Sequence, residues 1–204
     1  MKSVRKKARR RQPKQRRARM TVEAVLEAVV KLLKQEGAEA VTTNRVAEVA
    51  GVSIGSIYQY FPDKSAIFAA LHQRHVHEID RMVERTLIEH ARSRLDGMIR
   101  AMVEAMVKAH VGDPELYQVM AMEVPHRADG TPEFAVRLHG AFRLALAARA
   151  GELRRGRDLD KAAFVVAHMI EALGHGAVLR RPRGVSLEAA KEEAVRAVLV
   201  YLRS

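Results

Sequence analysis

The stretch TTNRVAEVAGVSIGSIYQYFPDKSAIF, residues 42–68, contains two short helical segments on either side of a glycine. Its threonine pair suits the start of the first helix, and Gly51 suits the end, because glycine adopts the left-handed conformation at little cost. Ser53 is a good N-cap for a second short helix that continues to Tyr60. Pro62 ends that helix, since proline has no backbone N–H to continue it. The spacing therefore predicts a helix-turn-helix.

The second of these helices has one face suited to packing and one suited to contact with DNA. Val52, Ile57 and Phe61 form the apolar face, which holds the helix against its neighbours. The major groove of B-DNA admits one α-helix, whose N-terminal side chains reach the base edges. A glycine within a helix lowers its stability by about 1 kcal/mol relative to Ala, which favours a role in close backbone approach. The face expected to meet DNA carries Ile54, Gly55, Ser56, Tyr58, Gln59 and Tyr60.

Residues 42–68 resemble the signature of the TetR family of bacterial transcriptional regulators. The resemblance consists of a Thr-initiated helix, the pattern Ala-Gly-Val-Ser-x-Gly, an aromatic pair followed by Phe61, and Lys64 with an apolar pair after it. It implies an all-α protein with an N-terminal three-helix helix-turn-helix DNA-binding domain and a larger C-terminal helical ligand-binding and dimerisation domain. We place these domains at residues 20–66 and 67–204.

The resemblance also implies which side chains contact DNA. Arg45 is an additional contact to either phosphates or bases. An Asn or Gln can bind adenine through two hydrogen bonds, and Ile54 can meet a thymine methyl group. Two alternatives stay open: pairs of short helices also occur as plain packing units, and Tyr58 can be partly buried against the first helix. The matching positions are Thr43, Tyr58, Tyr60 and Lys64 for phosphates, and Asn44, Ser53, Ile54, Ser56 and Gln59 for bases.

Longer helices are expected in the rest of the chain. Before the helix-turn-helix, apolar residues repeat at three and four positions over Met20–Glu36, and Gly37 ends that helix. Residues 125–130 and 181–186 are expected to be loops. The helices expected after Pro62 span Lys64–His90, Ser93–Val111, Pro114–Met122, Pro132–Arg154, Leu159–Arg180 and Leu187–Arg203.

The positive charge of the chain is concentrated at its N-terminus. The formal net charge is +12, and residues 1–19 contain eleven Lys or Arg and no acidic residue. From Met20 onward, 25 basic and 24 acidic residues leave a net charge of +1. We expect residues 1–19 to be a disordered arm, because dense like charges repel one another. The arm favours contact with DNA phosphates or the minor groove. The alternative is a solubilising or cloning-derived tail.

The last two expected helices are the candidates for a homodimer interface. Helix-turn-helix proteins usually bind DNA as two-fold dimers, because one helix reads too few bases. Both helices are apolar over a wider face than a surface helix needs. In the TetR family these elements form a four-helix bundle between subunits. The alternative is that both helices only close the core of the domain.

Between the two regions the sequence is rich in methionine, which suits a pocket for a small apolar ligand because its side chain is adaptable. Ordinary core filling is the alternative. The resemblance favours a pocket, since such regulators commonly release DNA when a small molecule binds. The candidate pocket residues are Met102, Met106, Met120, His139, Phe142 and His168.

Several classes of protein are not expected. The chain has no cysteine, which excludes disulfides and thiol chemistry. It has no glycine-rich phosphate loop, HExxH or nucleophile elbow, so we do not expect an enzyme. His168, Glu171 and His175 share one helix face, but one helix comfortably supplies only two of the three or four ligands that zinc needs. We therefore expect no metal site and no cofactor.

The most apolar stretch, residues 162–179, is interrupted by polar residues and predicts a core or interface helix, not a membrane span. We expect a cytoplasmic, homodimeric repressor that a small apolar ligand releases from an inverted-repeat operator in double-stranded DNA. The rival is a DNA-compacting protein without sequence specificity. It would use the basic arm but would not need the two short helices.

Overall fold

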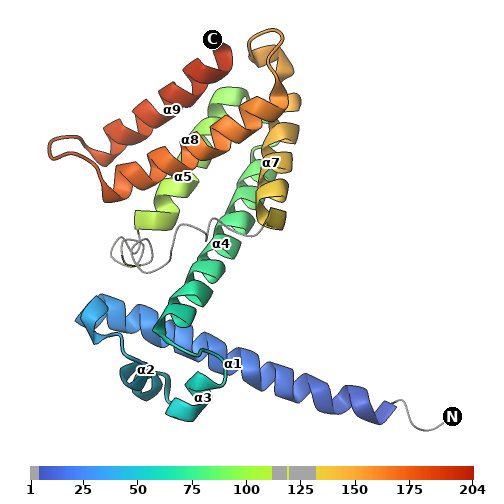
Figure 1. Cartoon of the computed structure of the whole chain (residues 1–204). Helices are drawn as coiled ribbons and strands as arrows, with labels where there is room; N and C mark the ends of the chain where they lie inside the picture. Colours follow the sequence, from blue (N-terminus) through green and yellow to red (C-terminus); the bar gives the residue numbers. More distant parts are fainter. Residues whose placement is uncertain (1–4, 112–118, 120–131) are drawn as a thin grey trace. The chain divides into compact units, whose positions relative to one another are not determined.

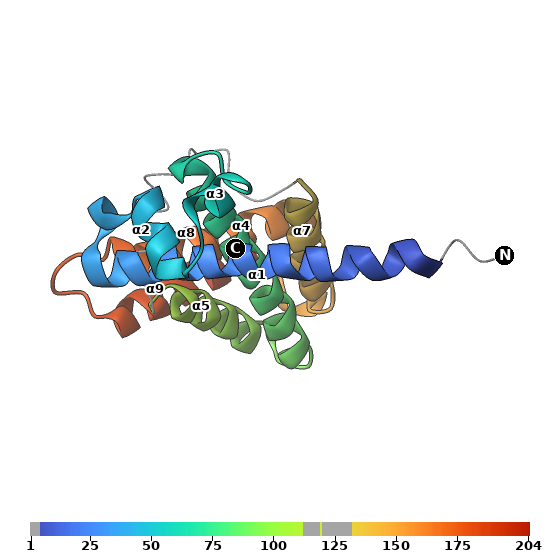
Figure 2. The same ribbon diagram turned by 90° about the horizontal axis from the view of Figure 1, so that it is seen from below.

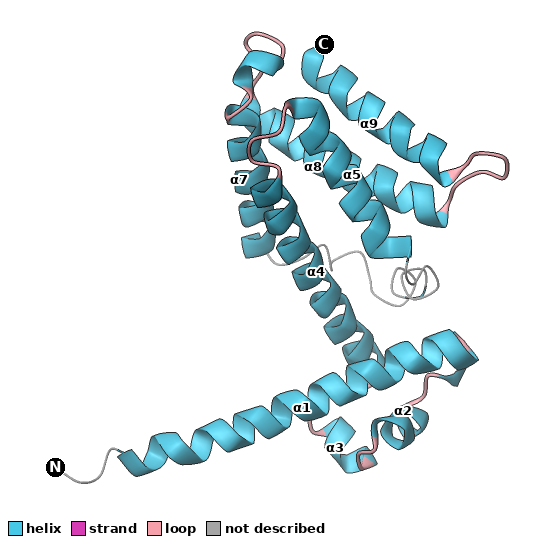
Figure 3. Cartoon of the chain, turned by 180° about the vertical axis from the view of Figure 1, so that it is seen from behind, coloured by secondary structure: helices cyan, strands magenta, loops and turns pink. Residues whose placement is uncertain are grey.

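The computed structural model describes residues 5–111, 119 and 132–204. Every regular element among these residues is a helix, as Figure 3 shows, which confirms the all-α prediction. The described residues form two compact units. The first extends to His72 and the second begins at Gln73, apart from Val119, which groups with the first.

Helix α1, Arg5–Glu36, supplies much of the core of the first unit. Val25, Val29 and Leu32 are fully buried, as their spacing of three and four residues predicts. The structure begins this helix at Arg5, whereas the sequence-based prediction began it at Met20, after the basic arm. The structure continues the helix through residues 5–19, which contain the helix formers Ala, Arg, Lys and Gln but also Pro13.

The helix-turn-helix follows α1 after a short 3-10 turn at Ala38–Ala40. Helix α2 spans Thr43–Ala50 and helix α3 spans Ile54–Tyr58, slightly shorter than expected. Gly51 joins them with a φ of 65°, a left-handed conformation that glycine adopts without strain. Figures 1 and 2 both show α2 and α3 on the same side of α1.

Helix α4, Lys64–Glu89, starts directly after Pro62 and Asp63, as predicted. The carboxylate of Asp63 accepts a hydrogen bond from the backbone N–H of Ala66 at 2.8 Å, which caps the first turn. The residues of α4 up to His72 belong to the first unit and the remainder to the second.

The second unit is built around a central apolar helix. Helix α8 packs against α5, α7 and α9, and α5 also packs against α9 (Figure 1). The predicted helix 114–122, with the candidate pocket residue Met120, and the predicted loop 125–130 lie outside the described residues except for Val119. The helices described in this unit after α4 are α5 (Leu95–Val111), α7 (Pro132–Ala147), α8 (Leu159–Leu179) and α9 (Leu187–Arg203).

Helix α7 ends at Ala147, where the sequence predicts a helix to Arg154, and a 3-10 turn at Ala150–Glu152 follows. The side chain of Arg149 explains the difference. Its guanidinium is buried and donates hydrogen bonds to the carbonyl oxygens of Ser93 at 2.9 Å and His90 at 2.7 Å. A buried guanidinium must have such partners, so the chain turns where Arg149 reaches the connection between α4 and α5.

Among the described helices, α8 is long and apolar enough to cross a membrane by length and composition. Core helices pass the same test. The side chains of Ala162, Val166 and Ile170 are buried against the neighbouring helices, so α8 is packed as a core helix, as predicted.

Candidate nucleic-acid interface

Helix α3 has a buried face and an exposed face, as the sequence predicts. Ile57 is fully buried and Phe61 is 5% exposed, so both anchor the helix in the first unit. Tyr58 is 54% exposed, and Gly55 and Gln59 are also at the surface. The exposure of Tyr58 argues against the alternative that this ring is buried against α1.

The two serines of α3 hydrogen-bond each other. The Ser53 hydroxyl accepts a hydrogen bond from the backbone N–H of Ser56 at 3.1 Å, and the two hydroxyl oxygens lie 2.8 Å apart. Ser53 is therefore the N-cap of α3, as expected. A contact from either hydroxyl to a base would share or replace this hydrogen bond.

The candidate phosphate contacts come from three elements. On α2, the Thr43 hydroxyl lies 3.5 Å from the hydroxyl of Tyr58 on α3; Thr43 is half-buried and Tyr58 is exposed. Tyr60 is half-buried at the end of α3. Lys64, in the first turn of α4, is half-buried with its ammonium 5.5 Å from the centre of the Phe68 ring. The surface that these residues form offers hydroxyls and one ammonium to an anion.

Arg45 and Asn44 are neighbours on α2 with different surroundings. Arg45 bridges two carboxylates, with nitrogen–oxygen distances of 2.7 Å to Glu36 and 2.8 Å to Glu48. The hydrogen bond from Arg45 holds the pKa of the Glu36 carboxyl below its usual value. Arg45 therefore ties α2 to the end of α1, and a contact to DNA would compete with both ion pairs. Asn44 is exposed.

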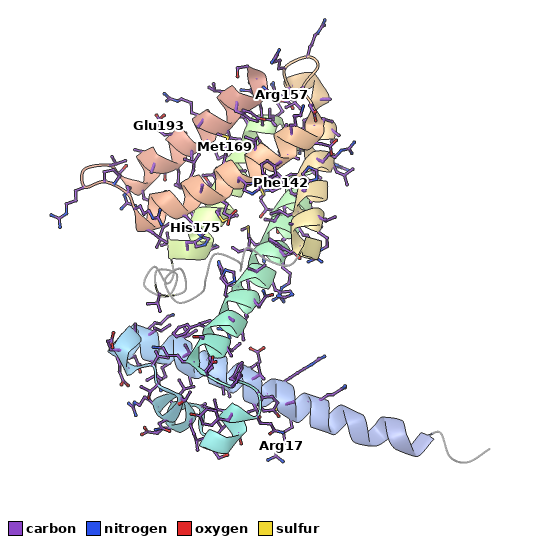
Figure 4. All side chains as sticks on the ribbon, in the orientation of Figure 1. Arg17, Phe142, Arg157, Met169, His175 and Glu193 are labelled. Atoms are coloured by element: carbon purple, nitrogen blue, oxygen red, sulfur yellow. The ribbon has the colours of Figure 1, made fainter. Side chains whose placement is uncertain are left out.

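An open groove of about 740 Å³ separates α3 from the N-terminal half of α1. Figure 4 labels Arg17 on the side of α1 that faces this groove. The sequence predicts the arm and the helix-turn-helix as separate DNA contacts, but in the structure residues of both line one groove. The groove is not predictable from sequence, because it depends on how α1 runs past α3. The lining consists of Gln15, Arg17, Ala18 and Thr21 from α1, and Gly51, Val52, Ser53, Ser56, Gln59 and Tyr60 from the turn, α3 and its end.

The structure brings together only part of the candidate ligand pocket. Met102, Met106 and Phe142 are buried in one core of the second unit. His139 is only partly buried, and its Nε2 lies 3.0 Å from the backbone oxygen of Asp160. His168 is exposed and stacks on Phe164, with ring centres 4.2 Å apart, so it lies apart from this buried core. The buried apolar residues of α8 face the core, so the imidazole of His168 lies on the outer face of this helix.

Two family models match the chain. Residues 25–71 match the model for bacterial regulatory proteins of the tetR family. Residues 94–202, more than half of the chain, match the tetracyclin repressor-like C-terminal domain. The chain belongs to the TetR family. It is a transcriptional regulator of that family, with a DNA-binding domain and a ligand-binding domain, and the helix-turn-helix of α2 and α3 lies within the first match.

Individual TetR-family relatives are similar over different parts of the chain. The nucleoid occlusion factor SlmA of Haemophilus ducreyi is 51% identical over 51 residues, which are 24% of this chain and 25% of SlmA. The match thus spans about a quarter of that relative's length. The HTH-type transcriptional repressor AcnR of Corynebacterium efficiens is 29% identical over 178 residues, 82% of this chain and 85% of AcnR.

A solved TetR-like structure has the same fold. The transcriptional regulator FadR from Bacillus subtilis, in complex with stearoyl-CoA, superimposes with a TM-score of 0.63 and 18% sequence identity, over 87% of this chain and 97% of FadR. AcnR and FadR are both described as transcriptional regulators.

Proposed function

We propose that the chain is a repressor that binds an inverted-repeat operator as a homodimer and leaves it when a small apolar ligand binds. The observation that carries the DNA-reading part is the exposure of Tyr58 and Gln59 around a fully buried Ile57, next to a groove that Arg17 lines. A short, firmly packed helix with polar side chains and a neighbouring positive charge suits a major groove flanked by phosphates.

In this proposal, the residues divide by role. Thr43, Tyr58, Tyr60 and Lys64 hold phosphates and so fix the position of α3 without reading sequence. Gln59 and Asn44 hydrogen-bond base edges, and Ile54 contacts a thymine methyl group. Gly55 lets the backbone approach the DNA, and its exposed position, with Ser53 Oγ 4.0 Å from the place of a Cβ, is compatible with that role. Arg45, Ser53 and Ser56 contact DNA only if they give up their present hydrogen bonds and ion pairs within the protein.

The homodimer forms through α8 and α9. Phe164 on α8 and Val200 on α9 are each 58% exposed, and Leu173 on α8 is also exposed. Large apolar side chains that remain at the surface of helices otherwise used for the core favour burial against a second subunit. A symmetric pair then presents two α3 helices to the two halves of an inverted repeat.

The ligand enters the methionine-rich core of the second unit. Met102, Met106 and Phe142 would line its apolar part, with His139 and Met120 as additional candidates. FadR of B. subtilis is described with a bound acyl-CoA and AcnR as a repressor. AcnR favours a repressor, and the stearoyl-CoA bound to FadR favours an effector with an apolar part. Helix α4 belongs to both units, so a ligand that shifts its second half would move Lys64 and α3 and change the half-site spacing. We place the protein in the cytoplasm, where its DNA is.

Selection of bound sequences from a random DNA pool tests the proposed function. The expected result is a single inverted repeat, whose complexes persist at moderate salt in excess random DNA. If the protein instead binds all sequences equally, and excess random DNA abolishes the binding, it is a DNA-compacting protein without sequence specificity.

A further inference from the structure

Three histidines from three helices meet in the second unit. His75 lies on α4, His110 near the end of α5 and His175 on α8. The ring centres of His75 and His110 are 5.2 Å apart, and those of His110 and His175 are 4.1 Å apart. Figure 4 labels His175 at the end of α8 beside α5. One helix supplies too few ligands for a metal ion. In this cluster, α4 and α5 each add one imidazole to that of His175 on α8.

A glycine on α8 permits this convergence. A Cβ at Gly174 would lie 2.5 Å from Cγ and 3.2 Å from Cβ of Met106 on α5, which is closer than packed carbon atoms approach. The absence of a side chain at Gly174 therefore lets α5 and α8 come close together. The next residue, His175, meets His110, which follows Met106 by one turn of α5.

The hydrogen bonds of His110 determine which nitrogen is available. Its Nδ1 lies 2.8 Å from the backbone oxygen of Met106, an acceptor, so Nδ1 carries the proton and Nε2 carries the lone pair. A backbone carbonyl that orients the far nitrogen is the usual partner of a metal-binding imidazole. The Nε2 of His175 lies 2.6 Å from the Nε2 of His110 and donates the shared proton to its lone pair.

The neutral charge state of the cluster suits a metal ligand. His110 is 1% exposed, and burial lowers its pKa to about 4, so the imidazole is neutral at neutral pH and able to act as a ligand. Burial also lowers the pKa of His175. The nearby charges have both signs: the Glu171 carboxylate acts on His110 and the Arg180 guanidinium acts on His175.

We propose that His75, His110 and His175 form a binding site for one divalent transition-metal ion. Imidazole nitrogen suits Zn²⁺, Cu²⁺, Ni²⁺ and Co²⁺. Two imidazoles on one tetrahedral ion, with metal–nitrogen bonds of about 2.0–2.1 Å, have ring centres roughly 5 Å apart, close to the spacing of His75 and His110. In the described residues, no group of three His, Cys, Asp or Glu side chains is arranged so that it could hold a metal ion, so these imidazoles must move to bind one.

The movement that binding requires between His110 and His175 is small. The Nε2 atoms of His110 and His175 must separate from 2.6 Å to roughly 3.3 Å, the distance between two ligands of a tetrahedral ion. Rotation of the half-buried His175 ring provides this separation, and its proton moves from Nε2 to Nδ1 through solvent, so the ring stays neutral. This metal site in the second unit does not depend on the proposed release from DNA by an apolar ligand.

Titration of the full chain with Zn²⁺ by calorimetry, after treatment with a chelator, tests the site. We expect one ion per chain, and with Co²⁺ the visible absorption of a tetrahedral nitrogen site. His75→Gln and His175→Gln should each weaken binding at least about 10-fold, the lower end of what altered metal shells cost. His168→Gln is the matched control, because this exposed histidine on α8 lies outside the cluster and should leave the affinity unchanged.

Thermal unfolding in the presence of Zn²⁺ keeps the test decisive if a variant is less stable. Zn²⁺ should raise the Tm of the wild type and of His168→Gln but not that of His175→Gln, because an ion stabilises only the fold that binds it. The proposal is overturned if the wild type binds no Zn²⁺ at micromolar concentrations. It is also overturned if His175→Gln binds as the wild type does, or if His168→Gln weakens binding equally.

Discussion

Single residues decide how closely the helices of the second unit approach. Gly174→Ala places a methyl group against Met106, and the cost of overpacking, about 1–3 kcal/mol, exceeds the gain in helix propensity of about 1 kcal/mol. We expect the free energy of unfolding in urea to fall, by up to about 2 kcal/mol. Gly176→Ala is the control on the same helix, since nothing lies within 4 Å of its Cβ position. Equal effects of the two substitutions would contradict the close approach at Gly174.

Asp158 is the N-cap of α8, where its carboxylate accepts hydrogen bonds from the backbone N–H groups of Asp160 and Lys161, each at 3.1 Å. The hydrogen bonds and charge of Lys161 hold the pKa of Asp158 below its ordinary value of 3.8. The cap therefore stabilises the fold fully above pH 3.8, and this stabilisation disappears as the pH falls through the lower pKa of the folded state.

Replacing Asp158 by Ala should lower the Tm at neutral pH, because Ala cannot cap a helix. Asp158→Asn keeps the cap without the charge, so its Tm should lie near that of the wild type and lose the pH dependence that Asp158 contributes. A Tm of Asp158→Ala equal to the wild type at pH 7 would show that the cap contributes nothing.

At the scale of elements, the sequence predicts best where periodicity and caps agree. The starts of α2, α4, α8 and α9 follow Thr42, Asp63, Asp158 and Ser186, each of which accepts a hydrogen bond from the first turn. The extension of α1 to Arg5 is not predicted by local sequence, because ten like charges and Pro13 within residues 5–19 oppose a helix there. The end of α7 is not predictable from local sequence, since it depends on carbonyl oxygens of the distant residues His90 and Ser93.

In the candidate interface, too, local features are predictable from sequence, and contacts between distant residues are not. The burial of Ile57 and the exposure of Tyr58 and Gln59 follow from periodicity and were predicted. The ion pairs of Arg45 with Glu36 and Glu48, and the groove shared by α1 and α3, join residues that no local pattern connects. The histidine cluster escapes for the same reason, because α4, α5 and α8 supply one histidine each.

The N-terminal half of α1 should strengthen binding to every DNA sequence. Deleting residues 1–19 removes eleven positive charges, including Arg17 of the groove. The slope of log K against log salt should become less steep by about 0.9 for each phosphate that the arm neutralises in the intact protein. Fluorescence anisotropy at several salt concentrations measures this slope. An unchanged slope would mean that the arm does not bind DNA phosphates.

At the scale of the whole molecule, the proposed mechanism requires a dimer. Phe164→Glu places a charge on the exposed apolar face of α8 and should shift the protein from dimer to monomer in sedimentation equilibrium, because a buried unpaired charge is costly. Leu144→Glu on α7 is the control, since this residue is 67% exposed and lies outside the proposed interface. A Phe164→Glu protein that remains dimeric would place the interface elsewhere.

The position of α3 in the major groove is the claim on which the proposed function depends. The direct measurement is selection from a random DNA pool with the wild type, Gln59→Ala and Tyr58→Phe side by side. We predict an inverted repeat for the wild type and loss of preference at one base pair in each half-site for Gln59→Ala, worth about 1–3 kcal/mol. Tyr58→Phe should bind more weakly with the same motif. A wild-type motif without two-fold symmetry, or a Gln59→Ala motif identical to the wild type, would contradict the proposed position of α3.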